Sequence, residues 1–502
     1  MFMNLYSAKE VRKLDSLIIK NQKISAFQLM QKAAEFSFNV LLNHWPNTKR
    51  IYVFSGSGKN SGDGYLLAKI AKEHGLESFI ITTAKPKVSA GITNKAYKLA
   101  LKAKVKTISM QSFKKESLKD SVIVDSLIGT GLKGKVRKSI SNLINEINAK
   151  KKFSSVLSID IPSGICADTG SALDSYVEAD VTATFIGRKK GCFTSTGKAA
   201  SGIIEFNDLG ASYKLKNKIK PNTYKLDMEK GVKKLKTRKE DSHKGNFGHT
   251  LVIGGDRGFG GAAILASKAA VYSGAGLVSL ATRPVHLEAA LSSCPEVMVN
   301  GVESGQEVEE LLTKASVVVL GPGLGNSAWS EQMLQRTFME AKRRKLPIVL
   351  DADGLNLLTK LKLSSGLPTN LVITPHPGEA AKLLNKTSKE IQLDRFKSIR
   401  QLQRKFKAIC VLKGSGSLVC YRKNYNQMIG VCDAGNPGMA KGGMGDVLAG
   451  IIGSFISQKL NLIEATETAV DLHSKAADLS YLELGISFLP TEVIQNARLL
   501  IR

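Results

Sequence analysis

Short apolar runs alternate with helical stretches along this chain of 502 residues, and the alternation occurs twice. An opening segment from Ser7 to Leu42 has apolar residues at helical spacing, which predicts helices. The apolar runs of the first half lie at Ile51–Phe54, Phe79–Thr82, Val122–Val124, Val156–Ile161, Val181–Phe185 and Ile203–Phe206. Strands that alternate with helices predict a parallel sheet covered on both faces, and the last run is expected to be an edge strand.

The same alternation restarts after a Lys-rich interval, between about Gly210 and His243, that shows no sustained period. In the part of the chain after this interval, helices are expected at Ala262–Tyr272 and Val447–Phe455. The expected strands are Thr250–Ile253, Leu277–Ala281, Val317–Leu320, Ile348–Leu350, Leu371–Thr374, Ile409–Leu412 and Ser417–Tyr421. The sequence therefore predicts an α/β protein of two tandem three-layer αβα domains, residues 1–212 and 228–502, joined by a Lys-rich linker, 213–227.

The net charge of +29 raises the question of a nucleic-acid partner. Most of the excess lysines are scattered over the whole length, and the most basic stretch, Lys214 to Lys244, coincides with the connector. We therefore expect a solvated Lys-rich surface and no nucleic-acid partner, with a functional nucleic-acid surface as the alternative.

The cysteines and the hydropathy indicate the compartment. No apolar run resembles a signal peptide or reaches the roughly 20 residues needed to span a bilayer, so we expect a cytoplasmic protein without a membrane partner. Six cysteines without a CxxC pair predict buried thiols in a reducing compartment. They are Cys166, Cys192, Cys294, Cys410, Cys420 and Cys432.

A Gly-rich segment, GSGKNSGDG at 56–64, follows the first predicted strand and leads into a helix. Glycines allow backbone N–H groups to approach a phosphate at a helix N-terminus. The segment is not a Walker A loop because no GK[ST] follows, and it lacks the dinucleotide fingerprint because Ser61 occupies the third Gly position. A tight strand-to-helix turn is the alternative interpretation.

Two further strand ends carry acidic residues beside Gly-rich loops. The segments are VDSLIGTGLKG at 124–134 and SIDIPSG at 158–164. Because ligands gather at the carboxyl ends of parallel strands, Asp125 and Asp160 are expected near Asn60 and Asp63 at one edge of the sheet. The alternative is that each Asp caps the helix that follows it.

These motifs, together with ADVTATFIGRKKGCFTSTGKAASGIIEFNDLG at 179–210, resemble the YjeF-type N-terminal domain of the NAD(P)H-hydrate epimerase family. The resemblance implies a Rossmann-like domain that inverts C6 of a hydrated nicotinamide ring by loss and return of a proton or of the hydroxyl group. A positioned carboxylate can serve as the acid/base, and Asp160 is the candidate.

The resemblance also implies a potassium ion held by Asn60, Asp125 and Ser163. The implied substrate contacts are Lys59, Asn60, Ser61, Gly62, Asp63, Gly129, Thr130, Gly131, Leu132, Lys133, Gly134, Lys135 and Asp160. The chain departs from the family pattern at Ser57, where Pro is usual, and at Lys59, where the family has an Asn. Lys59 places a cation beside the loop, which favours an anionic ligand.

In the second half, NPGMAKGGMGDVLAGIIGSF at 436–455 combines glycines, an acidic residue and an apolar helix. Successive N–H groups at that helix start make an anion hole, and Asp446 can exchange a proton with a substrate hydroxyl. A plain Gly-rich helix start is the alternative. GxGD at a helix N-terminus is similar to the arrangement in ribokinase-like enzymes.

Other motifs resemble one branch of that superfamily, the NAD(P)H-hydrate dehydratases. They are HKGNFGHTLVIGGDRGFGGAAILA (243–266), GPGLG (321–325), DADGLNLL (351–358), TPHPGEAAKLL (374–384) and VLKGSGSLV (411–419). The resemblance places the nucleotide at Lys413, Gly414, Ser415, Gly416, Ser417 and Gly445, and the hydrated cofactor at Ala262, Gly323, His376 and Asp446. Met444 replaces the usual Thr of GTGD.

Three side chains of this half permit two interpretations. His376 could pack a turn, although a Pro-flanked loop at a strand end favours contact with the substrate. Asp351 and Asp353 resemble a metal pair, but one of them could cap the next helix.

The implied dehydratase reaction phosphorylates the C6 hydroxyl from ADP and then eliminates phosphate, with magnesium neutralising the phosphates and Asp446 as the base. The leading hypothesis is a bifunctional repair enzyme for hydrated NADH and NADPH that forms homo-oligomers. The alternatives are a ribokinase-like kinase of a vitamin precursor fused to a ligand-binding domain, and a first domain that only binds or scaffolds.

Overall fold

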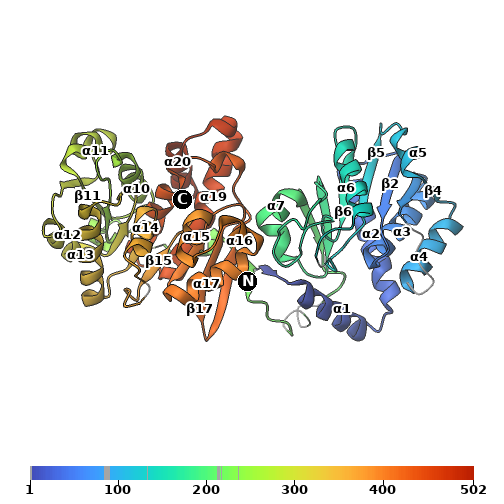
Figure 1. Ribbon diagram of the computed structural model, residues 1–502, viewed down its shortest axis with the longest axis horizontal. Coiled ribbons are helices and arrows are strands. Elements are labelled where there is room, and N and C mark those ends of the chain that lie inside the picture. The colour runs from blue at the N-terminus through green and yellow to red at the C-terminus, as the bar shows by residue number, and fades with distance from the viewer. Residues whose placement is uncertain are drawn as a thin grey trace. The chain divides into compact units, whose positions relative to one another are not determined.

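The computed structural model describes residues 3–83, 91–132, 134–211, 215, 218–235, 237–363 and 365–501. The chain forms two compact units, one of Asn4–Thr223 and one made chiefly of Tyr224–Arg502. Figure 1 shows a sheet in each unit with helices on both of its faces. The boundary between the units lies within the interval 213–227 that the sequence predicts as a linker.

The sheet of the first unit is parallel and has the strand order β4-β3-β2-β5-β6-β7-β8. Its strands are β2 (Arg50–Ser55), β3 (Glu77–Thr82), β4 (Lys106–Ile108), β5 (Ser121–Ser126), β6 (Ser155–Ile159), β7 (Val181–Phe185) and β8 (Ile203–Asn207). The chain order reverses between β2 and β5, so the loops after β2, β5 and β6 meet at one edge, where such sheets bind ligands. β8 lies at the sheet edge, as predicted.

Alternate residues of these strands face two helical layers. Ile51 and Val53 pack with α1 (Ala8–Gln22), α2 (Ala26–His44), α3 (Lys59–Glu73) and α4 (Ile92–Lys102). Tyr52 and Phe54 pack with α5 (Met110–Lys114) and α6 (Lys138–Lys150). A short α7 (Ser195–Ser201) precedes β8. The period of two along β2 therefore separates the two halves of this core.

The sheet of the second unit is mixed, with the order β9-β18-β17-β16-β15-β14-β13-β10-β11-β12. The strands are β9 (Thr223–Lys225), β10 (His249–Ile253), β11 (Leu277–Thr282), β12 (Met298–Gly301), β13 (Val317–Leu320), β14 (Ile348–Leu350), β15 (Leu371–Ile373), β16 (Ile409–Leu412), β17 (Leu418–Lys423) and β18 (Asn426–Val431). Strands β10 to β16 pair in parallel, whereas β17 is antiparallel to both β16 and β18.

Helices cover this sheet on both faces. One layer packs residues such as Val252 and Val319 against α10 (Gly260–Tyr272), α18 (Met444–Ser457), α19 (Leu462–Leu484) and α20 (Pro490–Leu500). The remaining helices are α9 (Met228–Val232), α11 (Leu287–Ser293), α12 (Glu307–Lys314), α13 (Ala328–Arg344), α14 (Asp353–Lys360), α15 (Pro377–Leu384), α16 (Ser388–Leu393) and α17 (Arg395–Phe406). Among these, α12 contacts β10 and β11, and α17 contacts β16 and β17.

Several segments differ from the sequence prediction. The predicted strand Val156–Ile161 ends at Ile159, because Asp160 adopts a positive φ of 72° that leaves the extended conformation. Tyr224 and Leu226, expected in the linker, are buried in the core of the second unit. Strands β4, β12 and β18 were not predicted, and each is short or rich in polar residues.

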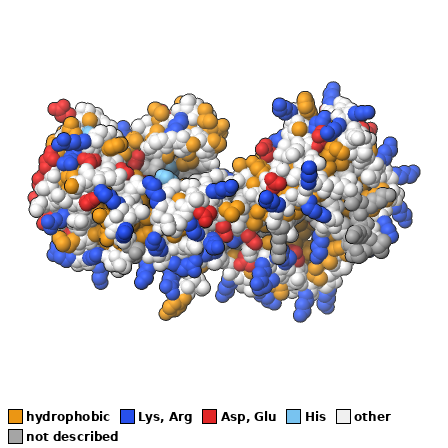
Figure 2. All heavy atoms as spheres, viewed as in Figure 1, with side chains coloured by type: hydrophobic (Ala, Val, Ile, Leu, Met, Phe, Trp, Pro, Cys, Tyr) orange, Lys and Arg blue, Asp and Glu red, His pale blue; other side chains and the backbone are white. Residues whose placement is uncertain are grey.

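The surface agrees with the scattered charge of the sequence. Figure 2 shows Lys and Arg side chains spread over the visible face, with acidic side chains among them. All six cysteines are free thiols, and Cys166 differs from the expectation because it is only partly buried. Across the described part of the chain, no helix is both long and apolar enough to cross a membrane.

Candidate active sites

A cavity of about 740 Å³ lies in the first unit where β2, β5 and β6 end. Its lining comes from α1, α2, the start of α3 and the loops that follow the strands. The predicted site residues that line it are Lys59, Asn60, Asp63, Gly129, Thr130, Gly131, Leu132, Lys135 and Asp160. Residues from three separate Gly-rich loops therefore meet at one cavity.

Three predicted contacts are not among the lining residues, and a fourth falls outside the described part of the chain. Ser61 is buried in α3 and donates its hydroxyl to the Ser126 carbonyl at 3.2 Å. Gly62 packs against Met30, because a Cβ added to it would lie 2.6 Å from the Met30 thioether. Gly134 is not among the lining residues, and Lys133 falls outside the described residues.

Asp160 forms a buried ion pair with Lys189, which the sequence reasoning did not identify. The Lys189 ammonium is fully buried and donates to Asp160 Oδ1, to the Phe185 carbonyl at 2.9 Å and to Thr184 Oγ1 at 3.1 Å. The positive φ of Asp160 turns the chain directly after β6. The only sequence signal for Lys189 is its position in GRKKG, shortly after β7.

The residues expected to hold potassium lie beside this cavity. The Asn60 side-chain amide is buried, and neither its oxygen nor its nitrogen has a hydrogen-bond partner among the described residues. Asp125 accepts from the Ser163 hydroxyl at 2.5 Å and from its N–H at 2.8 Å. The Ser163 hydroxyl also lies 3.2 Å from the Ile128 carbonyl. An unpartnered amide oxygen, a carboxylate, a hydroxyl and a backbone carbonyl are ligand types that suit a hard cation.

Two more carboxylates face the cavity near Asp160. Burial, with the adjacent charge of Asp160 second, raises the pKa of Asp63 well above its ordinary value. Burial raises the pKa of Asp15 to about 6, although Lys189 opposes the shift. Asp15 lies on α1 and was not predicted as a site residue. No motif surrounds it, so the sequence contains no local signal for this role.

The second unit brings four charged side chains together at the ends of β14, β15 and β16. Lys413 Nζ lies 2.7 Å from Asp351 Oδ1 and 4.0 Å from Glu379 Oε2. A Cβ added to Gly445 would lie 3.0 Å from the same ammonium, so the start of α18 closes this cluster. Asp446 follows Gly445 in the first turn of α18. The structure thus brings together Lys413, Gly445 and Asp446, three of the residues that the resemblance assigns to the nucleotide and the substrate.

Burial governs the protonation of these acids. It raises the pKa of Asp446 to about 7, and the negative charge of Asp351 adds to the shift while Lys413 opposes it. Burial also raises the pKa of Glu379 to about 7. Carboxyl groups that titrate near neutral pH can exchange protons with a bound substrate.

The loop 413–417 is held by Arg395, a fully buried residue that was not predicted. Its guanidinium donates to the carbonyls of Leu412 at 3.0 Å and Lys413 at 3.2 Å, and to Gly416 at 3.4 Å. A buried arginine on α17 therefore fixes the backbone that the sequence assigns to the nucleotide.

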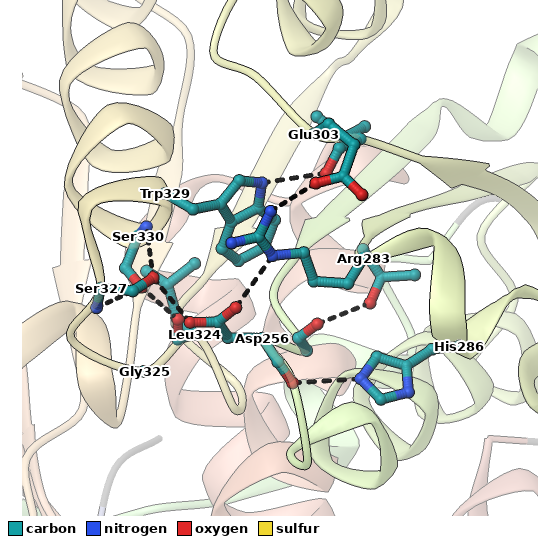
Figure 3. A network of polar contacts seen from close by, with 12 residues as sticks. Asp256, Arg283, His286, Glu303, Leu324, Gly325, Ser327, Trp329 and Ser330 are labelled. Carbon is teal, nitrogen blue, oxygen red and sulfur yellow. Dashed lines mark hydrogen bonds and ion pairs between the residues drawn. The ribbon is translucent and has the colours of Figure 1, made fainter.

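A polar network centred on Asp256 fixes the other predicted substrate loop (Figure 3). Asp256 accepts from Arg283 Nε at 2.9 Å and Ser327 Oγ at 2.6 Å, and its N–H donates to the Gly323 carbonyl at 2.7 Å. Gly323 has φ of 57°, and a Cβ there would lie 3.2 Å from that of Ala262. The network therefore holds Gly323 against Ala262, two residues predicted to contact the substrate.

The three ambiguous side chains take different roles. His376 Nδ1 accepts from the Gly378 N–H at 3.0 Å and caps α15, while its ring stays about half exposed. Asp353 begins α14 and accepts from the Gly325 N–H at 2.9 Å. Asp351 pairs with Lys413. Among the described residues, no three His, Cys, Asp or Glu side chains form a group that could hold a metal.

The loop before α18 is anchored at both of its ends. Asp478 accepts from the Gly435 N–H and the Asn436 amide, each at 2.9 Å. Lys441 donates to the carbonyls of Ile486 at 2.8 Å and Phe488 at 2.6 Å. The ammonium also lies 5.2 Å from the centre of the Phe488 ring. These contacts fix the glycines at the helix N-terminus.

Comparison with known proteins links both sites to one group. A family model described as NAD(P)H-hydrate dehydratase matches residues 250–498, and one described as YjeF-related protein N-terminus matches residues 26–191. The bifunctional NAD(P)H-hydrate repair enzyme Nnr of Coxiella burnetii is 40% identical over 499 residues, 99% of this chain and 99% of that protein. The Escherichia coli K12 protein of the same name is 36% identical over 462 residues, 92% of this chain and 87% of that protein.

A solved structure resembles the second unit. A ribokinase-like superfamily protein from Enterococcus faecalis V583 is 30% identical, with a TM-score of 0.51, and the match covers 56% of this chain and 96% of that chain. This similarity agrees with the predicted ribokinase-like fold.

Proposed function

The chain belongs to the family of bifunctional NAD(P)H-hydrate repair enzymes, and on this premise we propose that its first unit epimerises hydrated NADH and NADPH while its second dehydrates the S epimer. The second reaction consumes ADP and yields AMP and phosphate. The observation that supports two activities best is the presence of two separate acid clusters, around Asp160 and Asp446, each at the carboxyl edge of its own sheet.

In the first unit, the cavity has room for a nicotinamide nucleotide, and Asp160 is the acid/base at C6. Lys189 holds the Asp160 carboxylate in one orientation. Potassium, held by Asn60, Asp125 and Ser163, would supply a fixed positive charge beside the phosphate loop. The unpartnered amide of Asn60 supports this assignment.

In the second unit, Asp446 takes the proton of the C6 hydroxyl, which makes that oxygen a nucleophile toward phosphorus. The N–H groups at the start of α18 and the Lys413 ammonium beside Gly445 bind the phosphates. Magnesium would neutralise charge on the phosphates. Because no group of three potential ligands forms among the described residues, the ADP phosphates and water would be its main ligands.

The proposal is tested with mixed R and S epimers of hydrated NADH, ADP and Mg²⁺, by following the absorbance of the restored dihydronicotinamide. We expect complete conversion, since the epimerase supplies what the dehydratase consumes. Conversion that stops at the S fraction would contradict the epimerase assignment. Phosphorylation of a vitamin precursor without any repair would instead support a ribokinase-like kinase.

The same assay tests which of the two reactions depends on magnesium and which depends on potassium. Removal of magnesium should stop dehydration, and replacement of potassium by sodium should slow only the conversion of the R epimer. An equal response of both epimers to sodium would contradict a potassium site in the first unit. Sedimentation of the purified protein tests the expected homo-oligomer.

A further inference from the structure

The epimerase cavity contains a carboxylate that the chemistry above does not use. Asp15 lines this cavity together with Asp160. Its Oδ1 atom is buried and has no hydrogen-bond partner among the described residues. A buried polar atom without a partner destabilises the fold, so a position of this kind suggests a role for which the atom is kept free.

Asp15 and Asp160 reach the cavity from different elements. Asp15 projects from α1, whereas Asp160 follows β6 and is held by Lys189. The charged side chains that act on Asp15 are Arg12 from its own helix, Lys59 and Asp63 from α3, and the Asp160–Lys189 pair. The two carboxylates are therefore coupled electrostatically across the cavity while each is supported by its own element.

Inversion at C6 requires a proton donor and a proton acceptor. When the hydroxyl leaves, an acid gives it a proton, the C6–O bond breaks, and the lone pair of N1 forms a C6=N1 iminium with water as the leaving group. A water molecule then adds to the opposite face, forms a new C6–O bond and gives a proton to a base. The two proton transfers occur on opposite faces of the ring, so one carboxylate cannot perform both.

Resting on the epimerase function proposed above, we propose that Asp15 and Asp160 are the two catalytic groups of the epimerisation, each exchanging a proton with the C6 oxygen on one face of the ring. One carboxyl starts protonated and the other ionised, and the pair exchanges these states in each turnover. Because each group serves as acid in one direction and as base in the other, the reaction is reversible and needs no other co-reactant.

Asp63 is a weaker candidate for the second group. It lies within α3, and burial and the charge of Asp160 raise its pKa well above the ordinary value. Asp15 differs from it in geometry, because Asp15 Oδ1 is a buried oxygen that has no hydrogen-bond partner among the described residues. Burial raises the pKa of Asp15 only to about 6, so this carboxyl both gains and loses protons near neutral pH.

The test substitutes Asp15→Asn in the full chain and follows R-to-S conversion without ADP, by separation of the two epimers. We expect kcat to fall about 100-fold or more, because a general acid/base contributes at least that factor, while KM changes little. Glu35→Gln, which neutralises an exposed acid on the neighbouring helix α2, is the matched control and should leave the rate unchanged. Dehydration of purified S epimer by Asp15→Asn should also proceed at the wild-type rate, because that reaction belongs to the second unit. The circular dichroism spectrum and thermal unfolding of the variant check that the first unit is folded.

The pH profile separates catalysis from a structural role. Wild-type kcat should follow a bell-shaped curve with one limb near pH 6, because the productive form carries one proton on the coupled pair. Asp15→Asn should lose that bell, and Asp15→Glu should keep it at reduced height with a displaced limb. If Asp15→Asn does not fold, the pH dependence of kcat in Asp15→Glu tests the proposal instead, and a displaced limb would support it.

Three results would overturn the proposal. They are a wild-type kcat in Asp15→Asn, a loss confined to KM, or an unchanged pH limb in Asp15→Glu. A wild-type protein that leaves separated epimers unchanged would overturn the epimerase function itself, and the role of Asp15 with it.

Discussion

At both sites, burial sets the protonation of individual acidic side chains. Asp15, Glu379 and Asp446 have pKa values raised to about 6, 7 and 7 respectively. Each would be fully ionised at neutral pH on an exposed surface. Desolvation therefore converts ordinary carboxylates into groups that exchange protons under physiological conditions.

Asp446 should determine the pH dependence of the dehydratase. Since the ionised carboxylate is the base and burial raises its pKa to about 7, kcat for the S epimer should rise with pH up to about 7 and then level off. Asp446→Asn should lower kcat by about 100-fold or more, because a general base is lost. Initial rates measured between pH 5 and 9 check both expectations.

Glu379 titrates in the same range and supplies the control. Its negative charge raises the pKa of Asp446, so Glu379→Gln should move the rising limb to lower pH without removing it. Disappearance of the limb in Glu379→Gln, with retention in Asp446→Asn, would show that Glu379 is the titrating group.

At the scale of elements, both sites use a Gly-rich loop that ends at a helix N-terminus. No side chain caps the first turn of α3 or α18, so backbone N–H groups at these helix starts can bind phosphates. In α3 the Ser61 N–H is an exception, because it donates to the Gly58 carbonyl at 3.2 Å. The sequence predicts these loops because glycine spacing is a local signal. It does not predict Lys441, which anchors the loop before α18, or Arg395, which holds the loop 413–417, because the carbonyls that these side chains bind lie on other elements.

Lys441 should hold the loop before α18 in a fixed position. Lys441→Met removes the donors to Ile486 and Phe488 but keeps an apolar stem against the Phe488 ring. We expect the dehydratase kcat to fall about 10- to 100-fold, because small displacements of a catalytic loop have effects of this size. Lys397→Met, on an exposed position of α17, should have no effect. Equal rates for the two variants would show that Lys441 does not position the loop.

Strand prediction succeeded where burial is continuous. The runs at β2, β5 and β13 are apolar along their length, since a central parallel strand is covered on both faces. β12 and β18 were not predicted, because partly exposed polar residues such as Asn300 and Gln427 interrupt the apolar runs of these strands. Backbone hydrogen bonds to the neighbouring strands β11 and β17 hold these two segments in the extended conformation, although their own sequences do not indicate a strand.

At the scale of the whole molecule, the two units have separate cores and separate sites. We therefore expect the two activities to be separable by single substitutions in the full chain. Asp160→Asn should convert only the S epimer, whereas Asp446→Asn should interconvert the epimers without restoring the dihydronicotinamide. An equimolar mixture of the two variants should convert both epimers completely, as absorbance would show. A mixture that stops at the S fraction would mean that the intermediate does not pass between protein molecules.

The sequence by itself determined the two α/β units, the Gly-rich loops, the placement of Asp160 at a sheet edge and the placement of Asp446 at the start of a helix. These features follow from hydrophobic periodicity and glycine spacing, which act over a few residues. Tertiary structure alone decided that Asp15 faces the cavity of Asp160, that Lys189 pairs with Asp160, and that Lys413 lies against Asp351. Burial and ion pairing depend on residues far apart in the chain, and they set the pKa values on which the chemistry depends.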